Sequence, residues 1–149
     1  MQEPIPNETK SSTPKIYPIK WIPWGVFLGG PLAGTYYLSK NFEALNQKKQ
    51  AKKILRIGVI SSCLLFTIIL LIPEQILNAV PSMIGPLALI LGFYHYAKST
   101  QEDLLTEYAQ QESSSFSGWK VTGVAILAFL ASVLYFIFLA LILPESLIT

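Results

Sequence analysis

Few side chains in this 149-residue sequence could do chemistry, and they are scattered along it. The candidates are Cys63, His95, Glu74 and Glu145. A single cysteine cannot form an intramolecular disulfide and leaves the redox compartment open, and a single histidine cannot build a histidine-rich metal site. The two glutamates each follow a proline and have no partner base, which an active site would need. We therefore predict no catalytic residue, no metal site and no cofactor.

His95 has two interpretations, because it lies in an aromatic run with Tyr94 and Tyr96. It could handle a proton or ligate a metal, or it could belong to an interfacial aromatic belt, which we favour. The middle of every apolar stretch lacks Asp, Glu, Lys and Arg. Ion-coupled pumps and proton relays usually keep an ionisable residue inside the membrane, so this pattern argues against them.

The elements that carry these residues are apolar. Hydrophobic residues make up 52% of the chain and charged residues 13%, where a soluble domain carries about 25% charged residues. Four stretches, residues 21–38, 55–72, 76–97 and 121–143, approach the length of about 20 residues that spans a bilayer. We predict an all-α polytopic membrane protein with four transmembrane helices after a flexible tail, residues 1–20. A formal charge of +2 is too balanced for a nucleic-acid binder.

The positions of lysine and arginine predict the orientation, because these residues are retained in the cytoplasm. The loop 39–54 is strongly basic, whereas segments 73–75 and 144–149 contain no basic residue. We expect loops 39–54 and 98–120 inside and the C-terminus outside. If residues 21–38 cross, the three lysines of the tail lie outside, whereas a re-entrant hairpin leaves all 11 basic residues inside. Charge alone favours the hairpin.

An internal repeat favours the crossing instead. Residues 30–33 and 85–88 both read Gly-Pro-Leu-Ala, and residues 71–74 and 142–145 both end in Pro-Glu. These matches indicate two tandem two-helix hairpins in parallel orientation, which must enter the bilayer in the same sense. Both Gly-Pro pairs would then lie near mid-bilayer. On this basis we expect four spans with both termini outside.

Two groups of residues are the predicted sites. Glycine lets a neighbouring backbone approach and proline kinks a helix, so we expect kinks and close packing. These residues are Gly25, Gly29, Gly30, Pro31, Gly34, Gly85 and Pro86. A basic helical face next to the bilayer would attract anionic lipid headgroups. It consists of Lys48, Lys49, Lys52, Lys53 and Arg56.

Several short motifs carry a resemblance. Residues 28–34 read Leu-Gly-Gly-Pro-Leu-Ala-Gly, and residues 37–42 read Tyr-Leu-Ser-Lys-Asn-Phe. Further along, residues 97–101 read Ala-Lys-Ser-Thr-Gln and residues 117–120 read Ser-Gly-Trp-Lys. This pattern resembles small uncharacterised bacterial inner-membrane proteins. The resemblance implies a bacterial inner membrane and no particular chemistry.

Three functions remain open on the sequence. We favour a non-catalytic integral membrane protein that packs with itself or with another membrane subunit. The alternative is a small transporter or channel module that acts as a homodimer around its Gly-Pro kinked helices. A membrane enzyme is the weakest, because the predicted topology places His95 on the opposite side from Glu74 and Glu145.

Overall fold

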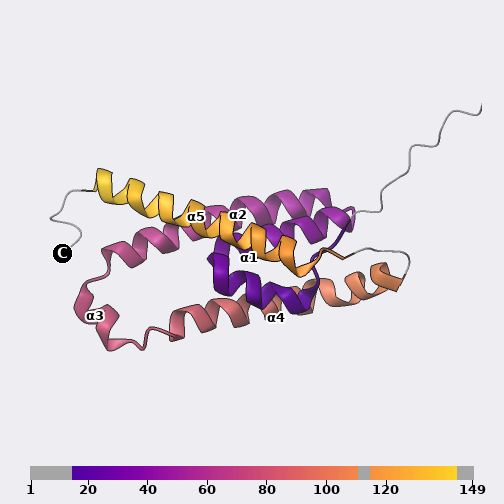
Figure 1. Cartoon of the computed structure of the whole chain (residues 1–149), viewed down its shortest axis with the longest axis horizontal. Helices are drawn as coiled ribbons and strands as arrows, with labels where there is room; N and C mark the ends of the chain where they lie inside the picture. The colour runs from indigo at the N-terminus through magenta and orange to yellow at the C-terminus, as the bar shows by residue number, and fades with distance from the viewer. Residues whose placement is uncertain (1–14, 111–114, 144–149) are drawn as a thin grey trace, which may run out of the picture.

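The computed structural model describes residues 15–110 and 115–143, and within these ranges it consists of helices and connecting turns. In chain order the helices are η1 (Ile19–Trp21), α1 (Ile22–Ala44), α2 (Lys48–Leu71), α3 (Glu74–Ala79), α4 (Ile84–Gln110) and α5 (Gly118–Ile142). Figure 1 shows α2 and α5 running along one side of α1 and α4 along the other. The all-α prediction is confirmed for this part of the chain.

Two helices, α2 and α5, are long and apolar enough to cross a membrane. They contain the predicted stretches 55–72 and 121–143 except for the last residue of each, which is extended. Helix α2 ends where Pro73 forces the preceding residue out of the helical conformation, and Ile72 is accordingly extended. Its first residue is Lys48, so the basic residues form its opening turns. The predicted loop 39–54 is therefore wrong, because only residues 45–47 separate α1 from α2.

The first apolar stretch folds back on itself, because α1 breaks at Gly30 (Figure 1). Contacts between the two arms run antiparallel. The backbone N–H of Tyr17, just before α1, donates to Oδ1 of Asn41 over 2.7 Å, whereas 24 residues of unbroken helix would span about 36 Å. The prediction that residues 21–38 form one crossing helix is therefore wrong. The alternative that charge favoured, a hairpin, describes this part of the chain.

The third apolar stretch, residues 76–97, is divided between α3 and α4. Val80 is extended, and a turn in which the Ile84 N–H donates to the Pro81 carbonyl (2.9 Å) starts α4. Pro86 consequently falls in the first turn of α4, where the missing N–H would have had no intrahelical partner. The predicted mid-helix kink at this proline is wrong. Helix α4 also continues to Gln110, through half of the predicted loop 98–120.

The Gly-Pro pairs of the two proposed repeats therefore occupy different places. Gly30 and Pro31 form the tip of the fold-back, while Gly85 and Pro86 begin a straight helix. The repeat thus has no structural counterpart at these positions, and the tandem arrangement with four spans is not what the described residues adopt.

Helix α1 forms the centre of the molecule. Helices α2, α4 and α5 each pack against α1 much more than against one another. The buried core joins residues of the segment before η1 and of α1, α4 and α5, namely Tyr17, Ile22, Val26, Ala33, Tyr37, Leu38, Ala97 and Val121. Beyond the tip of α1, α2 and α5 meet through Thr67 and Tyr135, whose hydroxyl oxygens lie 3.0 Å apart. Each long helix is thus positioned mainly by the fold-back helix.

Candidate functional site

Three glycines allow the two arms of α1 to pack closely against each other and against the neighbouring helices. A methyl group added at Gly29 would lie 2.6 Å from the carbonyl oxygen of Ala125 on α5. One added at Gly34 would lie 2.6 Å from the ring of Phe93 on α4, and one added at Gly25 would overlap the ring of Tyr37 on the second arm. The structure therefore has close contacts at three of the predicted packing positions, which no larger residue would permit.

Gly30 and Pro31 make the tip of the fold-back. Gly30 has φ of 66° and ψ of −161°, a combination that is essentially restricted to glycine. No atom lies within 4 Å of the place where its side chain would be, so the requirement is conformational and not one of space. Pro31 begins the second arm and is buried. The predicted break at this pair is present, as a reversal of direction instead of a kink.

Gly85 and Pro86 do not form a packing site within the chain. Both residues are exposed, and no atom lies within 4 Å of a side chain added at Gly85. The prediction that this pair packs against Gly30 and Pro31 is wrong. The physical reason is their position at the exposed start of α4, whereas Gly29 and Pro31 at the break in α1 are buried.

Two buried amide side chains join the N-terminal segment, α1 and α4. Asn41 accepts from the Tyr17 N–H over 2.7 Å, and its Nδ2 donates to the Tyr17 carbonyl over 2.9 Å and to Oε1 of Gln101 over 3.2 Å. Nε2 of Gln101 donates in turn to the Leu38 carbonyl over 3.0 Å. Both amides are completely buried. The sequence analysis missed this network, because Asn41 and Gln101 are distant in sequence and lie in segments predicted as loops.

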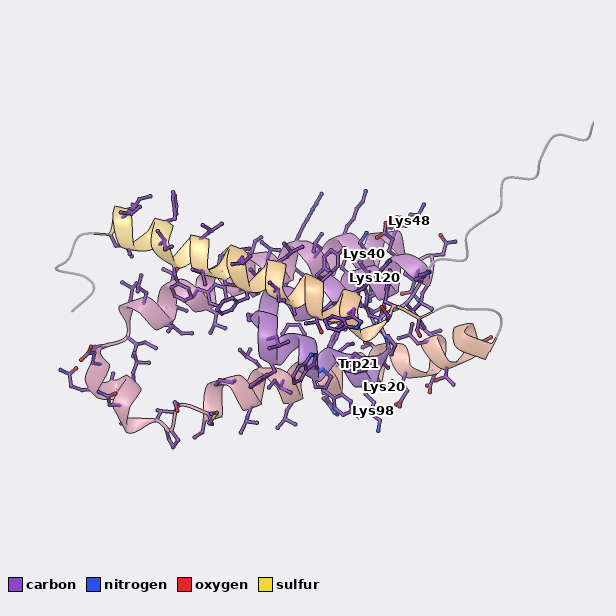
Figure 2. The ribbon with its side chains drawn as sticks, viewed as in Figure 1. Lys20, Trp21, Lys40, Lys48, Lys98 and Lys120 are labelled. Atoms are coloured by element: carbon purple, nitrogen blue, oxygen red, sulfur yellow. The ribbon has the colours of Figure 1, made fainter. Side chains whose placement is uncertain are left out.

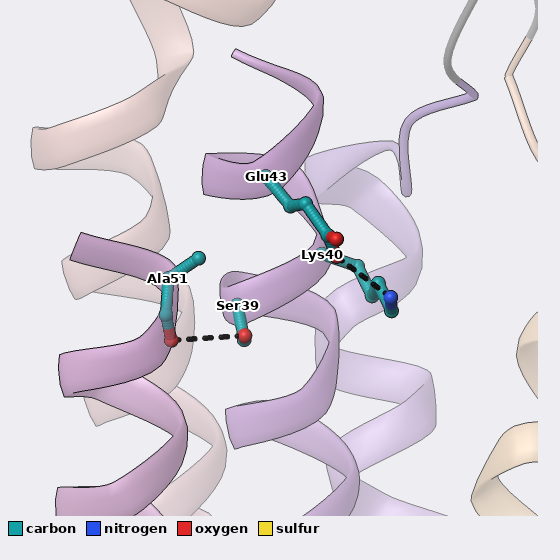
Figure 3. A network of polar contacts seen from close by, with 4 residues as sticks. All are labelled: Ser39, Lys40, Glu43 and Ala51. Atoms are coloured by element: carbon teal, nitrogen blue, oxygen red, sulfur yellow. Dashed lines mark hydrogen bonds and ion pairs between the residues drawn. The ribbon is translucent and has the colours of Figure 1, made fainter. Parts of the chain in front are cut away.

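The same end of the molecule holds a second set of polar contacts, between α1 and α2 (Figure 3). The hydroxyl of Ser39 donates to the carbonyl of Ala51 over 3.0 Å and ties the two helices together. Lys40 and Glu43 form an exposed ion pair at 2.6 Å. Their hydrogen bond raises the pKa of Lys40 and lowers the pKa of Glu43.

Burial, with a smaller contribution from Tyr36, raises the pKa of the Tyr17 hydroxyl to about 12.

The predicted basic face lies at this end as well. Figure 2 shows Lys20, Lys40, Lys48, Lys98 and Lys120 in the half of the molecule away from α3. The basic residues of α2 are all exposed, and they are Lys48, Lys49, Lys52, Lys53 and Arg56. We call this half the basic end. It combines residues from η1, α1, α2, α4 and α5, which no single loop of the sequence would indicate.

A groove runs between α2 and α4, with the second arm of α1 as its floor. Its wider part is a cavity of about 370 Å³, and a second cavity of about 260 Å³ continues it along α4. The two cavities share Leu38, Phe93 and Tyr96. Gln50 and Lys53 lie where the groove meets the basic end, and Ala88 and Leu89 line its far part. We call this feature the α2–α4 groove.

The residues that first suggested chemistry do not come together. His95 is exposed on α4, Cys63 is half-buried on α2, and Glu74 is exposed at the start of α3. Glu145 lies outside the described residues. Within residues 15–110 and 115–143, no group of three His, Cys, Asp or Glu side chains is arranged to hold a metal ion. Among the cavities of the described residues that have both polar and apolar lining, the α2–α4 groove is the one that adjoins a further, mainly apolar cavity.

Comparisons with protein-family models, with curated proteins and with solved structures found no match to this chain.

Proposed function

We propose that the chain is a non-catalytic, multi-pass integral membrane protein. The observation that carries this proposal is the exposure of its most apolar helices. Only 11% of the apolar window of α2, and the same share of α5, is buried inside the molecule. A core helix of a water-soluble protein is mostly buried, whereas a lipid bilayer covers such a surface without further protein. The resemblance to small bacterial proteins favours the bacterial inner membrane.

In this arrangement α2, α4 and α5 cross the bilayer and α1 is re-entrant. The first arm of α1, residues 22–29, is about 12 Å long, too short for a hydrocarbon core of about 30 Å. Irregular backbone at membrane depth is tolerated only where protein covers it, and Gly29 and Pro31 on either side of the break are buried. The N-terminal segment then lies in the cytoplasm together with the whole basic end, in keeping with the distribution of lysine and arginine.

The topology can be tested with single cysteines in a Cys63→Ser background and a membrane-impermeant thiol reagent. We expect Gln75→Cys to react in intact cells, while Gln50→Cys and Lys15→Cys react only after the cells are opened. Reaction of Lys15→Cys in intact cells would restore a crossing first helix. The expectation that both termini lie outside concerns residues 1–14 and 144–149, which are outside the described ranges, and Lys15 tests the same question.

The biological role that we propose is assembly, with a second copy or with another membrane subunit. Helix α4 packs mainly against α1, with a smaller contact to η1, and its buried residues Ala97, Gln101 and Leu105 all lie in the half nearer the basic end. Its other half presents large apolar side chains outward, with Leu87 53% and Leu91 64% exposed. Neither α2 nor α5 covers this half, so a neighbouring helix can pack there.

Cross-linking in native membranes tests this role. In the Cys63→Ser background, Leu87→Cys is expected to cross-link to one partner with a short bifunctional thiol or thiol–amine reagent. Leu127→Cys, on the exposed face of α5, serves as the matched control. Equal cross-linking of both positions, or none at Leu87→Cys, would contradict assembly through α4.

A second candidate function, a small transporter or channel module acting as a homodimer, is supported by the broken helix at Gly30. Secondary transporters bind substrates where helices are discontinuous near the bilayer midplane. A discrete homodimer in which Leu32→Cys reacts with the impermeant reagent would support this alternative. A foreign subunit as the cross-linked partner, with an unreactive Leu32→Cys, would support assembly without transport.

A further inference from the structure

The α2–α4 groove is elongated, and its lining is polar at one end and apolar at the other, which helix packing alone does not require. We propose that it binds one anionic phospholipid of the surrounding bilayer, with the phosphate at Lys53 and an acyl chain along Ile57, Phe93 and Leu89. The proposal rests on the membrane insertion proposed above. Beyond membrane insertion, it assigns a class of ligand to the groove between α2 and α4 and a position for that ligand within it.

The groove exists because α2 and α4 both pack against the second arm of α1 and hardly contact each other. Thr35 and Leu38 of that arm form the floor, and both are buried. The two cavities of about 370 and 260 Å³ adjoin and together fall within the usual range for small-molecule sites, about 300–1,000 Å³. A chain molecule can therefore lie along the groove.

The polarity of the lining changes along the direction of the helices. On α2 the polar end is formed by Gln50 and Lys53, and Ile57 follows one turn further from the basic end. On α4 the lining passes from Tyr96 through Phe93 to Leu89. A phospholipid has the same order, with a charged phosphate at headgroup level and an apolar chain toward the bilayer centre. The stem of Lys53 can lie along the apolar wall while its ammonium group reaches the headgroup.

The charge of the groove selects an anionic headgroup. Among the residues that line the two cavities, Lys53 is the only charged one. The one ion pair in the described part of the chain joins Lys40 to Glu43, which line a different cavity. The charge of Lys53 is therefore available, and Lys49 and Arg56 on the same helix add to the positive potential. Basic pockets between helices on the cytoplasmic side are known to bind anionic headgroups.

A cavity of about 260 Å³ on the other face of the α1–α2 pair is less suitable. It is lined by Lys40, Lys48 and Lys52, but Glu43 lies among them and pairs with Lys40. No apolar cavity shares its lining as the second part of the α2–α4 groove does. Lys52 therefore provides a matched control, one residue away from Lys53 in sequence and on a different cavity.

Native mass spectrometry of the full chain released from detergent tests the proposal. The probes are phosphatidylglycerol and phosphatidylcholine with identical acyl chains, and inorganic phosphate alone. We expect one phosphatidylglycerol to bind in preference to phosphatidylcholine. Lys53→Gln should weaken that binding about fivefold, the effect of one basic residue near the membrane surface. Ile57→Trp, which fills the groove, should weaken the binding of both lipids.

Matched variants control for general effects. Lys52→Gln keeps the same net charge as Lys53→Gln, and Ile60→Trp places the same ring at an exposed position that does not line the groove. Equal weakening by Lys52→Gln would overturn the proposal in favour of diffuse attraction to the basic face. Equal binding of the two lipids would overturn it, as would displacement of phosphatidylglycerol by inorganic phosphate, which would indicate a soluble ligand.

Failure of the membrane proposal would look different. The full chain would then be released from the membrane fraction by alkaline carbonate before any lipid is added. Retention in that fraction together with non-selective lipid binding would contradict only the phospholipid site.

Discussion

The side chains of Asn41 and Gln101, 60 residues apart, are joined by a hydrogen bond of 3.2 Å in the most buried part of the basic end. Asn41 uses its remaining groups on the backbone of Tyr17, and Gln101 donates to the carbonyl of Leu38. The two amides thus hold the segment before α1, the second arm of α1, and α4 in one arrangement. Buried amides of this kind stabilise a fold only when every member is satisfied.

Replacing Gln101 by leucine should therefore destabilise the protein. The change leaves Nδ2 of Asn41 and the Leu38 carbonyl without this partner, and such buried groups cost about 1–3 kcal/mol in the free energy of unfolding. Gln75→Leu, on the exposed surface of α3, is the control and should have little effect. Thermal unfolding in detergent measures both variants. Equal melting temperatures for the two would contradict the network.

Gly30→Ala should destabilise the fold-back for a purely conformational reason. The φ and ψ of Gly30 are essentially restricted to glycine, and a side chain there costs about 1–3 kcal/mol although no atom obstructs it. Gly123→Ala is the matched control, because Gly123 lies in α5 with nothing within 4 Å. Alanine should be neutral there or stabilise the helix by up to about 1 kcal/mol. A harmless Gly30→Ala would show that α1 does not reverse at this residue.

Leucine should lower the stability of the protein at Gly29 and have little effect on it at Gly85. At Gly29 the side chain would separate α1 from the backbone of Ala125, and overpacking of this kind costs about 1–3 kcal/mol. At Gly85 the side chain meets nothing inside the chain, so Gly85→Leu should resemble Ala140→Leu, at another exposed position. A mid-helix kink at Gly85 and Pro86, as the sequence predicts, would make Gly85→Leu more destabilising than Ala140→Leu, and the exposed position of Gly85 removes that expectation. The unfolding temperatures of the three variants, measured on the monomer in detergent, decide the order.

Tyr17 predicts a loss of stability at alkaline pH. Burial favours the neutral hydroxyl and raises its pKa from 10.0 to about 12 in the folded protein. The resulting stabilisation is complete below pH 10 and is lost as the pH rises toward 12, because the unfolded chain ionises first. Tyr17→Phe should remove this part of the pH dependence while the part due to other groups remains. An unchanged profile between pH 10 and 12 in Tyr17→Phe would show that Tyr17 is not protected from ionisation.

The sequence by itself determined the features that depend on local composition. The long apolar runs that end at Pro73 and Pro144 predicted α2 and α5, because helix length and proline placement act within one segment. The clustered lysines likewise indicated the basic face at the start of α2. Gly25, Gly29 and Gly34 were recognised as packing residues, since a helix face without side chains can only serve close contact.

The tertiary structure alone decided the path of the first stretch. The same Gly-Pro-Leu-Ala sequence forms the tip of a reversal at Gly30 and an ordinary helix start at Gly85, so local sequence cannot distinguish them. The difference arises from the neighbours. The two arms of α1 pack against α2, α4 and α5, and Asn41 of the second arm bonds to Gln101 of α4. The residues just before Gly85 interrupt the helix instead, so Pro86 falls in the first turn of α4. Contacts between residues far apart in sequence stabilise one of two conformations that hydropathy and helix propensity leave nearly equal.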